Sequence, residues 1–262
     1  MAVLLVTTAI AQVPAKALKH ALNGTRSSAV VIDWKTGQIL AANGPARQDS
    51  PGSAIKPLLL NYALKAGIVR SMTTVYCRRD LHVGSRALPC THPPDRTTFD
   101  AETALAESCN TWFAAMARRF PPQQLEDALE RTGLRHVSMQ HATVEERELA
   151  VLGLNGVSVT PIAMARAYRE MLQHGPYDAV MRGLRGSVEY GMANNARVAH
   201  VNVLGKTGTA ANAQTARTHG WFAGAVPGRF VVVVYVPDGN GAEAAALAGK
   251  FIAATVAGSA VQ

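Results

Sequence analysis

The sequence predicts an α+β (α/β) fold, an antiparallel sheet flanked by helices and interrupted by an all-helical part. Two observations predict it: apolar, β-branched runs lie near both ends of the chain, and the stretch between them has a mostly helical pattern. Such strands can form one sheet when the helices between them pack as a separate layer. We expect the sheet part at about residues 14–52 and 181–262, and the helical part at about 53–180.

The individual elements follow from capping, turn and breaker residues. Thr160-Pro161, for example, is a typical helix start, and Pro227-Gly228 and Pro237-Asp238 bound a β-branched run. We expect helices over residues 14–22, 54–66, 101–119, 123–132, 161–174 and 242–257. We expect strands over residues 28–33, 38–42, 198–204, 220–226 and 230–236.

Length and composition indicate a globular chain. Its 262 residues are 48% apolar and 17% charged, which supports a full core and excludes a disordered protein. No apolar run reaches the roughly 18 residues of a membrane-spanning helix. The net charge of +8 is spread over scattered arginines without a Lys/Arg run, so we expect attraction to anionic surfaces and no nucleic-acid partner.

Residues 1–11 have the pattern of a short export signal. Residues 2–8 are apolar, and Ala9-Ile10-Ala11 fits a small-x-small cleavage site, although no basic residue follows Met1. A plain strand or helix, or a weak membrane anchor, is the alternative. We therefore expect an exported, periplasmic or otherwise extracytoplasmic protein with residues 12–262 as its folded domain.

The segment Ser53-Ala54-Ile55-Lys56 places a serine and a lysine one helical turn apart. A serine hydroxyl is a weak nucleophile and needs a base within hydrogen-bond reach. Residues three apart share a helix face, and burial can lower the pKa of a lysine until its amine accepts a proton. Ser53 is thus a candidate nucleophile and Lys56 its candidate base; a helix cap followed by an exposed lysine is the alternative.

Two more short motifs follow, Ser108-Cys109-Asn110 and Lys206-Thr207-Gly208. Alone, the first could be a turn and the second a solvated strand edge. An earlier Lys-Thr-Gly, residues 35–37, lies at the expected hairpin turn, where glycine supplies positive φ, so we interpret it as structural. Together, S-x-x-K, S-x-N and K-T-G in this order indicate a serine acyltransferase built around a lysine.

These motifs resemble the penicillin-binding protein transpeptidase family, within the serine D,D-peptidase and β-lactamase-like superfamily. Five further segments also resemble that family: residues 33–41, 51–53, 159–161, 205–210 and 220–224. The resemblance implies a cleft between the sheet and the helical part. It also implies that Ser108 relays a proton between Lys56 and the leaving group, and that Asn110 binds the substrate amide.

For the third motif the resemblance implies a substrate-binding strand. Lys206, Thr207 and Thr209 would bind the terminal carboxylate of the substrate, and Gly208 would leave room for it. The backbone N–H groups of Thr209 and Ser53 would form the oxyanion hole.

The activity that the resemblance implies is D,D-acyl transfer on the D-Ala-D-Ala end of peptidoglycan stem peptides. β-Lactams would be covalent ligands, and neither a metal nor an organic cofactor is expected. We expect a stand-alone catalytic domain that acts as transpeptidase or carboxypeptidase. A class D-like β-lactamase and a non-enzymatic sensor of β-lactams or peptidoglycan are the alternatives.

Two departures weigh against the β-lactamases. Glu145, Glu146 and Glu148 lack the Glu-Leu-Asn word of class A enzymes, so we expect them on a solvated helix or loop. Class D enzymes have a hydrophobic residue where this chain has Asn110, and Tyr-Gly-Asn where it has residues 190–192, Tyr-Gly-Met.

The chain has three cysteines, Cys77, Cys90 and Cys109. Cys77 and Cys90 bracket a polar stretch, and a disulfide between them is our preferred interpretation, with two free thiols as the alternative. A metal site that adds His92 is disfavoured, because the spacing matches no common zinc pattern. We expect Cys109 to pack in the core and to point away from its two polar neighbours.

Overall fold

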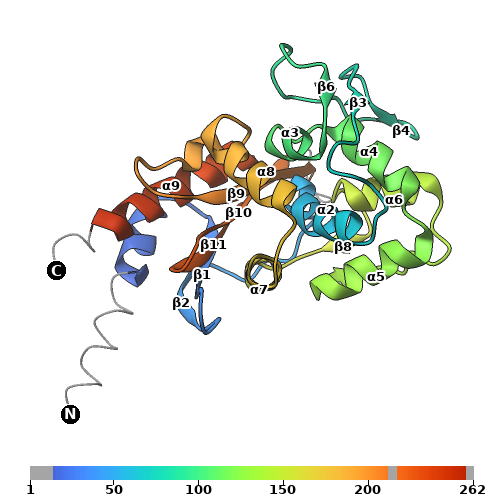
Figure 1. Ribbon diagram of the computed structural model, residues 1–262. Coiled ribbons are helices and arrows are strands. Elements are labelled where there is room, and N and C mark those ends of the chain that lie inside the picture. Colours follow the sequence, from blue (N-terminus) through green and yellow to red (C-terminus); the bar gives the residue numbers. More distant parts are fainter. Residues whose placement is uncertain (1–13, 212–216, 258–262) are drawn as a thin grey trace.

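The structure is a computed structural model that describes residues 14–211 and 217–257 (Figure 1). The predicted leader, residues 1–11, lies outside this part. No helix in the described ranges is long and apolar enough to cross a membrane.

A five-stranded antiparallel sheet in the order β2-β1-β11-β10-β9 forms the centre of the protein. It joins the hairpin near the start of the chain to the strands near its end, as predicted. The strands are β1 (Ser28–Asp33), β2 (Ile39–Asn43), β9 (Leu204–Ala211), β10 (Thr218–Val226) and β11 (Phe230–Val236). β11 is buried along its whole length, because helices cover both faces of the sheet.

Residues 14–21 form the first helix, and a short 3-10 helix, η1 (Gly52–Ile55), leads directly into α2 (Lys56–Lys65). The remaining helices are α3 (Ala101–Ala106), α4 (Asn110–Arg119), α5 (Pro122–Thr132), α6 (Val144–Val151), α7 (Pro161–Gln173), α8 (Asp178–Glu189), η2 (Asn194–Ala196) and α9 (Gly241–Ala257).

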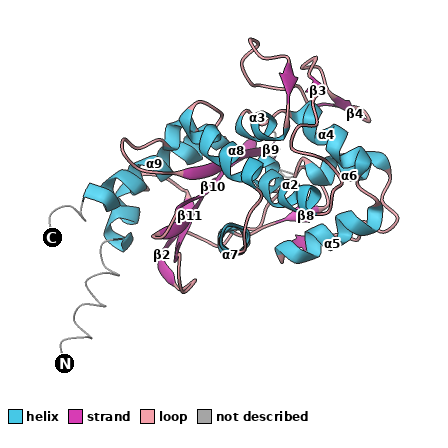
Figure 2. Ribbon diagram, in the orientation of Figure 1, coloured by secondary structure: helices cyan, strands magenta, loops and turns pink. Residues whose placement is uncertain are grey.

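Between these helices lie pairs of two-residue strands, drawn as short arrows in Figure 2. They pair as β3–β6, β4–β5 and β7–β8. Their bounds are β3 (Val75–Tyr76), β4 (His82–Val83), β5 (Arg86–Ala87), β6 (Thr98–Phe99), β7 (Arg135–His136) and β8 (Val157–Ser158).

Each face of the sheet covers its own apolar core. On one face, α9 and the first helix bury residues such as Leu18, Phe230 and Phe251. On the other, α7 and α8 contact the sheet, and a larger core that includes Trp112 and Trp221 continues into the helical part. This arrangement confirms the predicted α+β fold with helices on both sides of an antiparallel sheet.

Two local predictions were wrong. Residues 198–203 are not a strand; the strand begins at Leu204, so the K-T-G motif lies within β9 itself. The helix expected over residues 101–119 is broken at Ser108, whose φ is +59°. The helix α8 was not expected as an element, and it packs along α3 and β9.

Candidate active site

The first motif lies at the junction of η1 and α2. In a 3-10 turn, side chains three residues apart are eclipsed, so Ser53 and Lys56 share one side of the turn. The backbone N–H of Lys56 donates to the carbonyl of Ser53, which closes this turn. Ser53 is partly exposed, whereas the Lys56 side chain is completely buried. A partly exposed serine thus lies one turn before a desolvated lysine.

The buried amine of Lys56 contacts the second motif. Nζ is 2.7 Å from Asn110 Oδ1, 3.1 Å from the Ser108 carbonyl and 3.3 Å from Ser108 Oγ. Burial lowers the pKa of Lys56 to about 8. A neutral amine can donate to the two carbonyl-type oxygens and still present its lone pair to a hydroxyl.

The helix break at Ser108 makes this contact available. α3 ends at Ala106, α4 begins at Asn110, and the positive φ of Ser108 lies between them. Both the carbonyl and the hydroxyl of Ser108 therefore face Lys56. A non-glycine residue in this conformation costs about 1 kcal/mol or more and requires support from its surroundings.

The third motif lies on the edge strand β9. Lys206 is completely buried, and Nζ donates to the Thr207 carbonyl at 3.1 Å. Burial, together with the nearby charge of Lys56, lowers the pKa of Lys206 well below its usual value. The Thr207 hydroxyl lies 3.4 Å from the Met192 carbonyl, and the exposed Thr209 accepts a hydrogen bond from the N–H of Gly241 at 2.9 Å.

Two glycines let the first and third motifs touch through their backbones. A Cβ on Gly208 would lie 2.2 Å from the Pro51 carbonyl oxygen and 2.8 Å from the Ala54 nitrogen. A Cβ on Gly52, whose φ is +52°, would lie 2.6 Å from the Thr209 carbonyl oxygen. Only residues without side chains fit at these contacts. The structure therefore brings all three motifs together.

A set of buried aromatic residues holds the chain on either side of Ser53. The carbonyl of Ser50 accepts hydrogen bonds from His219 Nε2 at 2.7 Å and Trp221 Nε1 at 3.0 Å. The hydroxyl of Tyr168 donates to the Ala54 carbonyl at 2.7 Å. Sequence reasoning did not single out His219 or Tyr168, because an isolated buried aromatic residue has no pattern that separates it from an ordinary core residue.

The three glutamates considered as deacylation bases lie on α6. Glu145 and Glu146 are exposed, as expected, and Glu146 completes a capping box with Thr143. The expectation was wrong for Glu148, which is buried and forms an ion pair with Arg118 at 2.5 Å. A carboxylate held by an arginine in this way does not provide a free base.

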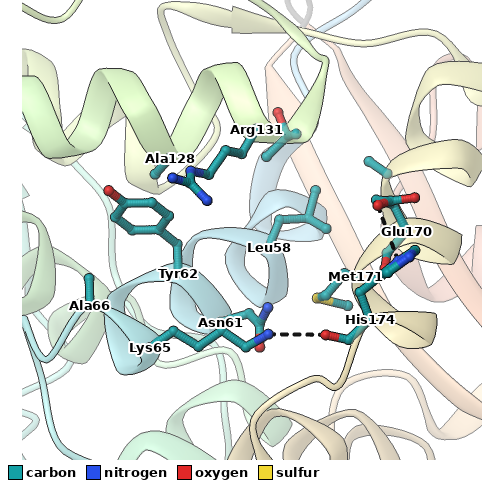
Figure 3. Close-up of a pocket in the computed structure, with 12 residues that line it drawn as sticks. Leu58, Asn61, Tyr62, Lys65, Ala66, Ala128, Arg131, Glu170, Met171 and His174 are labelled. Carbon is teal, nitrogen blue, oxygen red and sulfur yellow. Dashed lines mark hydrogen bonds and ion pairs between the residues drawn. The ribbon is translucent and has the colours of Figure 1, made fainter.

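A pocket of about 500 Å³ lies elsewhere, between α2, α5 and α7 (Figure 3). It is lined by residues such as Leu58, Tyr62 and Met171, and the guanidinium of Arg131 lies over the ring of Tyr62 at 5.6 Å. No residue of the three motifs lines it.

The predicted disulfide is wrong. Cys77 and Cys90 are both free and buried, and their sulfur atoms are 3.4 Å apart, whereas a disulfide bond is about 2.05 Å long. Cys109 is buried, as expected, and its sulfur lies 3.9 Å from that of Cys90. The three thiols thus form one cluster beside the second motif.

The fold thus brings together S-x-x-K, S-x-N and K-T-G, the motif set of the penicillin-binding proteins and related serine enzymes. The family model described as "Penicillin binding protein transpeptidase domain" matches residues 27–181 and 177–257. The chain belongs to this family. A search of curated protein sequences finds no match.

Solved structures share the fold of this chain. The D,D-transpeptidase domain of a peptidoglycan glycosyltransferase from Eggerthella lenta has a TM-score of 0.82 at 18% identity, covering 95% of this chain and 82% of its own. A peptidoglycan glycosyltransferase from Burkholderia ambifaria has a TM-score of 0.80 at 20% identity, covering 96% and 95%. PBP2 from Pseudomonas aeruginosa, in complex with WCK 5153, has a TM-score of 0.76 at 18% identity, covering 92% and 72%.

Proposed function

We propose that this protein is a penicillin-binding D,D-acyltransferase that acts on the D-Ala-D-Ala end of peptidoglycan stem peptides. The observation that carries the proposal is the buried Lys56 amine, which contacts Ser108 and Asn110 one helical turn from Ser53. Such a substrate lies outside the cytoplasmic membrane, so we also propose that the protein acts in an extracytoplasmic compartment. The catalytic cleft would lie between a sheet part, residues 14–52 and 181–262, and a helical part, residues 53–180.

In the first half-reaction, the Ser53 hydroxyl oxygen attacks the carbonyl carbon of the penultimate D-Ala. Its proton passes to the neutral amine of Lys56. The N–H groups of Ser53 and Thr209 stabilise the oxyanion. The peptide C–N bond then breaks, and the proton moves from Lys56 through the Ser108 hydroxyl to the leaving nitrogen. The products are free D-Ala and an ester on Ser53.

In the second half-reaction, an amine or a water attacks the carbonyl carbon of this ester and Lys56 accepts the proton of the nucleophile. The ester C–O bond then breaks, and Lys56 returns a proton to the leaving Ser53 oxygen, which restores the free hydroxyl and the neutral amine. An amine gives a cross-link, as in a transpeptidase, and water gives a trimmed peptide, as in a carboxypeptidase. Exclusion of water from the cleft decides between the two outcomes.

The remaining residues of the motifs would bind the substrate. Asn110 would hold the substrate amide, and the hydroxyls of Thr207 and Thr209 would bind the terminal carboxylate. Lys206 would position the strand that binds this carboxylate, since its buried amine donates to the Thr207 carbonyl. Gly208 lets the substrate approach the backbone of β9.

The β-lactamase alternative requires rapid hydrolysis of the acyl-enzyme. Glu148 is held by Arg118, and Asn110 occupies the place of the hydrophobic residue of class D enzymes. Both observations favour a long-lived acyl-enzyme, as expected of a transpeptidase or of a sensor. Turnover of a peptide separates those two.

A fluorescent penicillin tests the proposal directly. The protein is incubated with the drug and followed by intact mass, next to the variants Ser53→Ala and Ser85→Ala. Ser85 is the matched control, because its side chain is exposed in the turn between β4 and β5. We expect a persistent adduct in the wild type and in Ser85→Ala, and none in Ser53→Ala. Release of D-Ala from a D-Ala-D-Ala peptide is expected to require Ser53 as well.

The other outcomes identify the alternatives. Rapid loss of the adduct with accumulation of hydrolysed drug would make the protein a β-lactamase. An adduct without any release of D-Ala would favour the sensor. An adduct that persists in Ser53→Ala would refute Ser53 as the nucleophile.

The rate of acylation is expected to depend on pH through Lys56. The base must be neutral, and its pKa is lowered to about 8, so the acylation rate rises with pH up to about 8 and then levels off. The measurement is the second-order rate of adduct formation at a series of pH values, corrected for spontaneous drug hydrolysis. If the acylation rate instead rises up to about pH 10.4, the ordinary pKa of lysine, burial does not lower the pKa of Lys56.

A further inference from the structure

Four potential metal ligands meet beside the second motif: Cys77, Cys90, His92 and Cys109. All four side chains are at most 4% exposed. One ligand atom from each lies within 4.8 Å of every other. The ligands come from three separate segments, which follow β3, follow β5 and precede α4. The cluster therefore cannot be recognised from the spacing of these residues along the chain, because only the tertiary structure brings them together.

The distances between these atoms fit a tetrahedral metal ion. The Sγ atom of Cys77 is 3.4 Å from Cys90 Sγ and 3.4 Å from His92 Nε2, and Cys90 Sγ is 3.9 Å from Cys109 Sγ. Zn–S bonds of about 2.3 Å at tetrahedral angles place two sulfurs roughly 3.8 Å apart. The observed distances lie near this edge length and well beyond a disulfide bond.

The histidine is oriented as a ligand. His92 Nδ1 lies 2.9 Å from the carbonyl of Pro93. A carbonyl only accepts, so Nδ1 carries the proton and Nε2, which lies 3.4 Å from Cys77 Sγ, carries the free lone pair of the neutral ring. A hydrogen bond from the second nitrogen to a carbonyl is the usual support of a metal-bound histidine. The ring of Phe99 packs against His92 at 4.5 Å and helps exclude water.

We propose that Cys77, Cys90, His92 and Cys109 bind one Zn²⁺ ion in a closed, four-coordinate structural site. Three thiolates and an imidazole match the preference of Zn²⁺, and four protein ligands leave no position for a catalytic water. Each thiol releases its proton on binding, and no electron is transferred. This proposal differs from the sequence analysis, which disfavoured a metal site because the spacing of the ligands along the chain matches no common zinc pattern.

The proposed zinc site would stabilise two parts of the protein, the segment from Cys77 to Phe99 and the Ser108-Cys109-Asn110 motif. The segment from Cys77 to Phe99 contains only two-residue strands (Figure 1). The ion would join Cys77, at its start, and Cys90 and His92, in its interior, to Cys109, which directly precedes α4. Cys109 stands between Ser108 and Asn110, the two residues that contact Lys56. A metal bond to Cys109 therefore holds Ser108 in its positive-φ conformation and keeps Asn110 against the lysine.

Metal content tests this proposal independently of activity. The protein is produced without a polyhistidine tag, reduced, and analysed for metals by elemental mass spectrometry. The reduced protein is also titrated with Zn²⁺ against a chromogenic chelator. The same measurements are made on the variants Cys90→Ser, His92→Ala and His82→Ala. His82→Ala is the matched control, because the His82 side chain is exposed on β4. We expect about one Zn²⁺ per chain in the wild type and in His82→Ala. Loss of a direct ligand is expected to weaken binding about 100-fold or more.

A second measurement uses only the wild type, in case the variants fail to fold. Replacing the ion by Co²⁺ is expected to give the intense visible bands of a tetrahedral thiolate site. A strong chelator is expected to lower the melting temperature and the rate of adduct formation, and added Zn²⁺ to restore both. A reduced, folded protein that binds no Zn²⁺, binding that His92→Ala leaves unchanged, or a native Cys77–Cys90 disulfide would each overturn the proposal. None of these outcomes would contradict the proposed role of Ser53, which the adduct experiment tests separately.

Discussion

Replacing Lys56 by methionine is expected to slow acylation of Ser53 by about 100- to 10,000-fold, the usual contribution of a general base. Methionine has a similar length and an apolar end, so it suits a completely buried position. It removes the proton acceptor from beside Ser53 and the donor that holds Ser108 and Asn110. The measurement is the second-order rate of adduct formation with a fluorescent penicillin.

The matched control is Lys65→Met, at the exposed end of the same helix, where Nζ contacts only the His174 carbonyl among its described partners. Its acylation rate should stay within twofold of the wild type, because an exposed contact of this kind contributes little. If Lys56→Met folds and is acylated within tenfold of the wild type, another group is the base.

Replacing Gly208 by alanine is expected to reduce acylation about 100-fold, the cost of moving reacting groups by about 1 Å. The new Cβ would lie 2.2 Å from the Pro51 carbonyl oxygen, so β9 must move away from η1. This shift separates the N–H of Thr209 from that of Ser53, and with it the two halves of the proposed oxyanion hole. The adduct rate and the melting temperature are measured together.

Gly228→Ala is the control for this change. Gly228 lies in the turn between β10 and β11 with a φ of +79°, and a Cβ there meets no atom within 4 Å. Gly228→Ala should lower the free energy of unfolding by about 1 kcal/mol, because positive φ is unfavourable for alanine. It should leave the acylation rate unchanged. Equal rates for Gly208→Ala and the wild type would contradict the close packing of β9 on η1.

Local patterns in the sequence predicted the three motifs and most of the sheet. S-x-x-K, S-x-N and K-T-G are separate in the sequence, and the structure brings them together: S-x-N contacts the Lys56 amine and K-T-G packs on the backbone of η1. Periodicity and turn residues predicted β1, β2 and β11 closely, since these strands are bounded by glycine, proline or polar turns. Signals of this kind are local and need no knowledge of packing.

Tertiary structure alone decided the features that depend on distant partners. β9 begins at Leu204 because its residues pair with β10, whereas the equally apolar residues 198–203 find no strand to pair with among the described residues. Ser108 breaks a helical pattern because its carbonyl and hydroxyl bond Lys56, 52 residues earlier in the chain. His219 and Tyr168 support the Ser53 turn only after the chain has folded.

The cysteines show the same limit most clearly. Their positions in the sequence alone suggested a disulfide between Cys77 and Cys90. In the fold, His92 and Cys109 complete a cluster whose atoms lie within 4.8 Å of one another. Spacing along a chain limits which atoms can meet, but the packing of three separate segments determines which of them do, and in what geometry.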